Sequence, residues 1–228
     1  YTVRLKNNKS FNCSSNSTIF EAAKINNINL EHSCLSARCR SCIVKLISGK
    51  TINKADESVL TASEKQQNYT LSCNAIPISD LQIDVEDLEG ITIFEKKIIP
   101  AKINSIDFLK KNIIKLKLRL PPNSNFKYNA GQYINLIKGD IVRSYSIADY
   151  PNENNEIELF IKKYQRGMMS EFLFTNAKIN DLLRIEGPLG SFFLRDSKKN
   201  NLVFLATGTG VAPIRSILKY MEINHKQY

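Results

Sequence analysis

The chain has 228 residues, of which 43% are hydrophobic and 24% are charged. This length exceeds one typical domain and the composition is that of a globular protein, so wholesale disorder, collagen and a coiled coil are excluded. The net charge is +10, and all of the excess lies in residues 91–228, which contain twenty-two basic and twelve acidic side chains. Such a field can attract anionic cofactors, an acidic protein or nucleic acid, but scattered lysines on a solvated face explain it more simply. No arginine-rich run is present, so nucleic acid is not expected as a partner.

The N-terminus favours a cytoplasmic protein without a membrane segment. No stretch reaches the roughly 18 apolar residues that cross a bilayer, and residues 1–6 alternate like a strand where a signal peptide would be continuously apolar. The first residue is Tyr1, so we expect the natural N-terminus to lie outside this sequence.

The first ninety residues predict a small mixed sheet with two short helices. Thr18–Glu21 and Thr61–Glu64 are capping boxes, each typical of a helix start, and the first helix is expected to end near Asn26. Strands are predicted at residues 1–6, 11–14, 43–47 and 81–86. This order indicates a β-grasp domain over residues 1–90.

Four of the five cysteines follow a definite spacing. Cys34, Cys39 and Cys42 form a C-x4-C-x2-C motif, and Cys73 follows thirty-one residues later. This is the plant-type [2Fe–2S] arrangement, in which a loop supplies three thiolates and the fourth comes from a distance.

Three other interpretations stay open for these cysteines. A zinc site normally has two C-x2-C pairs, and only one is present; disulfides do not suit an odd count without a secretory signal; chance is the third. His32 lies beside the loop but is not expected to be a ligand, because a Rieske centre needs two histidines. Cys13 is expected to be a packed small side chain.

Residues 1–88 resemble the plant-type ferredoxin family, which implies a cluster held near the surface. That family usually has glycine between the ligands, so that backbone amides can approach the sulfurs, whereas this chain has Ala37 and Arg40. We expect Arg40 to adopt an unfavourable φ or to add positive charge that favours the reduced cluster.

Beyond a linker near residues 88–98, the pattern changes to closely spaced strands that predict an antiparallel, six-stranded barrel over residues 97–196. Period-two segments lie at residues 101–106, 113–120, 132–137, 143–147 and 156–162, and a helix is predicted at 170–175.

Three motifs in this part suit nucleotide binding, although each has a plain structural alternative. Arg143 and Tyr145 share one strand face, where Arg can grip a pyrophosphate and Tyr can stack on a planar ring; an ordinary surface strand is the alternative. Gly167-Met168-Met169-Ser170 starts a helix that can bind phosphate through free N–H groups, unless Ser170 is simply a cap. Residues 202–207 are expected to be a buried parallel strand, and Gly208-Thr209-Gly210 then starts a helix, unless these glycines only turn the chain.

In order and spacing these motifs, together with Gly187-Pro188-Leu189-Gly190, resemble the ferredoxin–NADP reductase superfamily. The resemblance implies FAD in the barrel, with Arg143 on the pyrophosphate, Tyr145 against the isoalloxazine and Ser146 near its reactive edge, on the strand that also contains Ser144. It implies that Gly167–Ser170, with Met168 and Met169, meets the phosphates, and that Gly208, Thr209 and Gly210 meet the nicotinamide cofactor. Residues 200–228 would be the first β-α unit of an incomplete NAD(P)-binding domain, so the chain is expected to be truncated and to oxidise NAD(P)H poorly.

Within the superfamily the chain most resembles the CDP-6-deoxy-Δ3,4-glucoseen reductases. That implies an oxidoreductase in which electrons pass from NAD(P)H, with NADH favoured, through FAD and [2Fe–2S] to a pyridoxamine-phosphate-dependent sugar dehydratase. Two alternatives remain: the reductase of a ring-hydroxylating dioxygenase or monooxygenase, which shares every motif, and a non-catalytic module with structural zinc.

Overall fold

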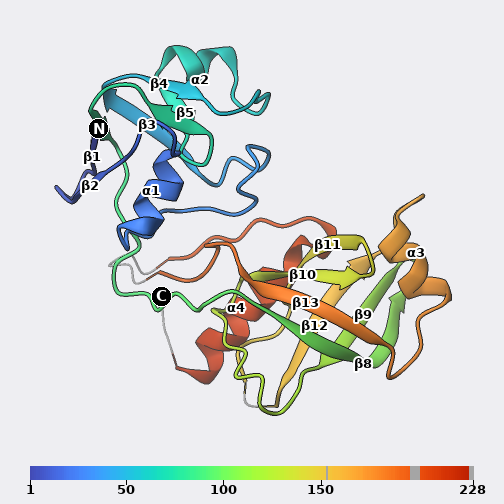
Figure 1. Cartoon of the computed structure of the whole chain (residues 1–228). Coiled ribbons are helices and arrows are strands. Elements are labelled where there is room, and N and C mark those ends of the chain that lie inside the picture. Colours follow the sequence, from blue (N-terminus) through green and yellow to red (C-terminus); the bar gives the residue numbers. More distant parts are fainter. Residues whose placement is uncertain (153, 196–200, 226–228) are drawn as a thin grey trace. The chain divides into compact units, whose positions relative to one another are not determined.

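The computed structural model describes residues 1–152, 154–195 and 201–225 and divides into two compact units, Tyr1–Ile91 and Thr92–Tyr228 (Figure 1). In the part of the chain so described, no helix is long and apolar enough to cross a membrane.

The first unit contains a five-stranded mixed sheet with the strand order β2-β1-β7-β3-β5. Its strands are β1 (Thr2–Arg4), β2 (Ser10–Asn12), β3 (Ile43–Ser48), β5 (Tyr69–Leu71) and β7 (Leu81–Ile83). β1 runs parallel to β7 and the other pairs are antiparallel, as in a β-grasp fold. A separate ribbon pairs β4 (Thr51–Asn53) with β6 (Ala75–Pro77).

Both predicted capping boxes are confirmed. Thr18 and Glu21 cap α1 (Ile19–Ile25), and Thr61 and Glu64 cap α2 (Ala62–Gln66), with side chain to backbone hydrogen bonds in both directions. α1 buries Ile19, Phe20, Ala22 and Ala23 against the sheet, because these positions recur on one helix face. The loop that contains Cys34, Cys39 and Cys42 therefore leaves a well-anchored helix and enters β3, which pairs with β7 and β5.

The second unit is the expected antiparallel barrel, with the strand order β11-β10-β13-β8-β9-β12. Its strands are β8 (Lys97–Lys110), β9 (Ile113–Arg119), β10 (Tyr133–Lys138), β11 (Ile141–Ser146), β12 (Glu156–Lys162) and β13 (Leu182–Leu189). An Ile147–Leu159 bridge brings the end of β11 to β12. Alternate residues such as Ile114, Leu116 and Leu118 fill the interior, which explains the period-two pattern of β9.

Two helices accompany the barrel. α3 (Met168–Thr175) begins two residues before its predicted start and contacts β11. The short 3-10 turn η1 (Gly208–Gly210) contacts β12 and leads directly into α4 (Val211–Ile223), which confirms the predicted turn and helix.

The buried parallel strand predicted at residues 202–207 is wrong. These residues form no strand, and Val203 and Leu205 are 84% and 90% exposed. A parallel strand that is buried on both faces needs neighbouring strands and covering helices, and the described residues supply no strand that pairs with it.

Candidate cluster and flavin sites

The four cysteines of the motif converge in two pairs. Three lie in the loop between α1 and β3, and Cys73 lies between β5 and β6. Cys42 Sγ and Cys73 Sγ are 3.0 Å apart, which is longer than the roughly 2.05 Å of a disulfide. The Cys34 amide lies 3.4 Å from Cys39 Sγ, which makes these two residues neighbours.

Backbone amides approach the sulfurs even though the loop lacks the expected glycines. The amides of Ser36 and Arg38 each lie 3.4 Å from Cys34 Sγ, and the Ala37 amide donates to Cys73. The loop reaches this geometry because Leu35, Ala37 and Arg40 have φ values of 52°, 56° and 64°. The expectation that Arg40 takes an unfavourable φ is confirmed.

These contacts change the acidity of the thiols. Burial alone would raise the pKa of Cys34, but hydrogen bonds from Ser36 and Arg38 outweigh it and lower the pKa to about 7. A hydrogen bond from Cys42 lowers the pKa of Cys73 to about 6, whereas the same contact, together with burial, raises the pKa of Cys42. Near neutral pH the Cys73 thiol is therefore mostly ionised and the Cys34 thiol partly ionised, and thiolate is the form that binds metal.

The two cysteine pairs suit a two-iron cluster. Within the described ranges, no three His, Cys, Asp or Glu side chains form a group that could hold a single metal ion. In a [2Fe–2S] cluster each iron takes two protein ligands, so two cysteine pairs joined by a common loop suit it. The same loop supplies N–H donors to the ligand sulfurs, which favours the anionic cluster.

Cys13 and His32, which were not expected to be ligands, make other contacts. Cys13 is 1% exposed and packs in the core of the first unit, which confirms its interpretation as a small apolar side chain. The His32 ring packs against Phe20 in a tilted arrangement at a centroid distance of 4.8 Å, and burial lowers the pKa of His32.

In the second unit, the strand register separates the predicted flavin residues onto two faces. Arg143 and Tyr145 pair with Leu136 and Ile134, whose side chains point into the barrel, whereas Ser144 pairs with Asn135 on the opposite face. Tyr145 packs against the core of the barrel, and this burial raises the pKa of Tyr145 to about 12. Ser146 shares the face of Ser144.

Ser144 belongs to a polar network that crosses three strands. Its hydroxyl donates to Asn135 Oδ1 at 2.7 Å, and Asn135 Nδ2 donates to Glu186 Oε2 at 2.8 Å. Glu186 Oε1 in turn lies 2.6 Å from Lys96 Nζ, and this hydrogen bond lowers the pKa of Glu186. The network ties β11 to β10 and β13 and so fixes the strand that contains Arg143 and Tyr145.

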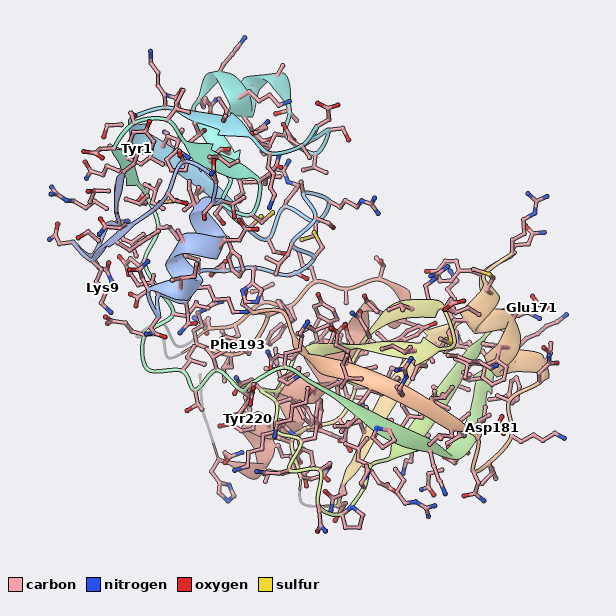
Figure 2. All side chains as sticks on the ribbon, in the orientation of Figure 1. Tyr1, Lys9, Glu171, Asp181, Phe193 and Tyr220 are labelled. Carbon is pink, nitrogen blue, oxygen red and sulfur yellow. The ribbon has the colours of Figure 1, made fainter. Side chains whose placement is uncertain are left out.

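The N-terminal turn of α3 lies beside β11. Figure 2 marks this helix by Glu171. Gly167 is the N-cap and makes no side-chain cap bond, and the Ser170 hydroxyl instead bonds Gly167 O at 2.9 Å and Tyr164 N at 3.2 Å. Ser170 is therefore not the N-cap, and the backbone amides of Met168, Met169 and Ser170 are the groups suited to an anion. A Cβ at Gly167 would lie 2.6 Å from Ser170 Oγ and 3.2 Å from Tyr164 O, so a side chain there would force Ser170 or the turn to shift.

α4 is fixed to the segment that follows β11. The Arg215 guanidinium bonds Glu158 Oε1 at 2.7 Å and Ala148 O, and it stacks over Phe160 at 5.3 Å. Ser216 bonds Asp149 O, and Lys219 Nζ lies 2.7 Å from Asp149 Oδ1. Gly208, Thr209 and Gly210 thus precede a helix whose position is set by Ala148 and Asp149, close behind Ser146.

The predicted site residues therefore form three groups: the four cysteines, the adjoining β11 and α3 motifs, and the turn before α4 next to β12. Comparison with known families then assigns both units. Residues 3–77 match the model of the 2Fe-2S iron-sulfur cluster binding domain, and residues 100–194 match that of the oxidoreductase FAD-binding domain.

Each unit thus resembles one of these two families.

Three curated relatives extend the likeness over most of the chain. It is 41% identical to the CDP-6-deoxy-L-threo-D-glycero-4-hexulose-3-dehydrase reductase of Yersinia pestis over 92% of this chain and 63% of that protein. It is 36% identical to protein RfbI of Salmonella typhimurium over 90% and 60%, and 30% identical to the phenol 2-monooxygenase reductase component DmpP of Pseudomonas sp. over 88% and 58%. The chain thus spans less than two thirds of the length of these relatives.

Among solved structures, the Amycolatopsis cytochrome P450 reductase GcoB superposes with a TM-score of 0.68 and 24% identity, over 99% of this chain and 69% of that one. This likeness concerns the fold.

Sequence reasoning missed three residues that fix α4 against β12 and the segment after β11. These are Asp149, Glu158 and Arg215. Each acts through a partner that is distant in sequence, so no local motif marks it; the Arg215–Glu158 pair, for example, spans fifty-seven residues.

Proposed function

We propose that this iron–sulfur flavoprotein reductase passes electrons from NAD(P)H through FAD and a [2Fe–2S] cluster to a partner enzyme. The observation that supports it most strongly is the coexistence, in one chain, of two cysteine pairs with amide donors and a barrel with nucleotide-binding motifs. Free thiols of this kind need a reducing compartment, so we place the protein in the cytoplasm.

A flavin, when bound, accepts a hydride and releases electrons singly to a one-electron centre. Arg143 would bind the FAD pyrophosphate, and Tyr145 would stack on the isoalloxazine with Ser146 near its reactive edge. The amides of Met168–Ser170 would bind the phosphates, with Gly167 allowing their approach. Gly208, Thr209 and Gly210 would meet the nicotinamide cofactor, for which NADH is favoured, and Cys34, Cys39, Cys42 and Cys73 would hold the cluster.

The partner we favour is the pyridoxamine-phosphate-dependent dehydratase of 3,6-dideoxysugar biosynthesis. The identity to the Yersinia hexulose-dehydrase reductase is 41%, compared with 30% to the phenol monooxygenase reductase component. The second candidate is therefore a reductase of an oxygenase.

The first experiment is an anaerobic reconstitution with iron, sulfide and FAD, followed by an absorption spectrum and counts of each per chain. Two iron, two sulfide and one FAD per chain are expected from the cluster and flavin types. A colourless protein that binds zinc and no FAD would exclude the function.

Electron transfer then separates the two candidates. The dithionite-reduced protein is mixed anaerobically with a sugar dehydratase loaded with its substrate or with an oxygenase component. Reoxidation of the cluster by the dehydratase alone supports the deoxysugar pathway, and reoxidation by the oxygenase alone supports the second candidate.

A further inference from the structure

Arg40 occupies a backbone conformation that costs free energy. Its φ of 64° lies in the left-handed region, where a side chain other than glycine is strained. Arg40 is also adjacent to Cys39, inside the loop that presents the cluster ligands. This cost of the backbone conformation is offset only if the arginine side chain makes favourable contacts elsewhere.

Such contacts are present, and they reach across the sequence to α2. Arg40 Nη1 lies 3.1 Å from Glu64 Oε2 and also donates to Val59 O, while Nη2 pairs with Glu64 Oε1. Two parallel N–H to oxygen bonds form the bidentate geometry that only arginine provides. The loop is thereby linked to a helix twenty-four residues away.

Glu64 is itself fixed, so it is a firm anchor. Its Oε2 accepts from Thr61 N at 2.8 Å and from Thr61 Oγ1 at 2.9 Å in the capping box of α2. The segment before α2 is held as well, because Glu57, whose side chain is 2% exposed, pairs with Lys65 at 2.7 Å and accepts from Leu60 N at 3.0 Å.

We propose that Arg40 and Glu64 form a clamp that fixes the cluster loop against α2, and that Glu64 offsets the charge that Arg40 brings next to the cysteines. They are positioning residues: neither binds iron, but together they slow the loss of the cluster and keep its potential from rising. This proposal rests on the proposed function only in requiring that a cluster is bound.

The test compares Arg40→Met, Glu64→Gln and the double variant with the wild-type chain, all reconstituted with cluster. Loss of visible absorbance in excess iron chelator gives the rate of cluster loss, and a dye-mediated titration gives the potential. All three variants are expected to lose the cluster about threefold faster, since exposed bidentate pairs are worth up to about this factor. The potential should rise in Glu64→Gln, which leaves Arg40 unpaired, fall in Arg40→Met, and stay near wild type in the double variant.

Two controls separate the clamp from simpler effects. Arg38→Met removes an exposed charge of the same loop and should change the potential without changing the rate of loss. Thr61→Ala weakens the cap of α2 and removes one contact that holds Glu64, but it leaves the Arg40–Glu64 charge pair, so it should keep the wild-type potential. Glutamine at position 64 still suits a capping box, so Glu64→Gln changes the charge more than the cap.

Wild-type rates of loss in both single variants, or potential shifts of the same sign in both, would overturn the clamp. A wild-type chain that assembles no cluster would instead overturn the proposed function, so the two failures are distinguishable.

Discussion

Replacing Arg215 with methionine should destabilise the second unit by leaving a buried carboxylate without its cation. The Glu158 side chain is only 7% exposed, and Arg215 is its ion-pair partner. Methionine has a similar length and keeps apolar contact with Phe160, so the substitution removes mainly the charge and the hydrogen bonds to Glu158 and Ala148.

The size of this loss in stability depends on how far the Arg215–Glu158 ion pair is shielded from water. Removing one partner of a fully buried pair costs roughly 3–5 kcal/mol. Arg215 is 32% exposed, and water can therefore partly replace it, so we discount the cost to about 2 kcal/mol. For a unit of this size that corresponds to a fall in Tm of roughly 6 °C.

The assay is thermal unfolding followed by the rise in flavin fluorescence as FAD is released, for wild type, Arg215→Met, Glu158→Gln and the double variant. The double variant should be more stable than Arg215→Met, because it removes the unpaired charge as well. Arg184→Met, an exposed arginine on β13, is the control and should change Tm by less than about 2 °C. Strictly additive effects in the double variant would refute the pairing argument.

Three further predictions concern the cofactor sites and pH. Gly167→Ala should weaken FAD binding at least about tenfold in a fluorescence titration, because its Cβ would meet Ser170 Oγ at 2.6 Å. Unchanged affinity would show that the turn at Gly167 does not belong to the FAD site. Cys42→Ser should abolish iron and sulfide binding, whereas Cys13→Ser, in the core, should retain both; equal losses in the two variants would contradict the assignment of ligands. The hydrogen bond from Lys96 lowers the pKa of Glu186, so its contribution to stability is present above the unfolded pKa of about 4.3 and is lost as pH falls through the lower folded value. Glu186→Gln should therefore destabilise the chain in denaturant titrations at pH 6 but not near pH 2, and a cost that does not change with pH would refute this linkage.

Local patterns predicted much of the fold, and the reasons are specific. Both capping boxes are four-residue signals, and the faces of β11 follow from the period of two, so Thr18, Thr61, Arg143 and Tyr145 were placed without tertiary information. The cysteine motif could be recognised in the sequence because three of its four members lie within nine residues.

The errors have equally specific causes. Residues 202–207 are apolar, and apolar runs favour a buried strand, but burial depends on neighbours that the run itself does not encode. β13 was not identified as a separate strand, because Gly187-Pro188 interrupts its pattern. The ion pair of Arg40 was missed, because its partner Glu64 lies in another element, twenty-four residues away.

The docking of α4 on β12 affects where the second unit can be divided. Glu158 and Phe160 point away from the barrel interior and are covered by Arg215, while Gly131 lies against Ile217 and Ser216. A fragment that ended at residue 195 would expose the Phe160 ring and a carboxylate without its cation. Fusing the barrel to another protein therefore requires that residues 211–219 are included.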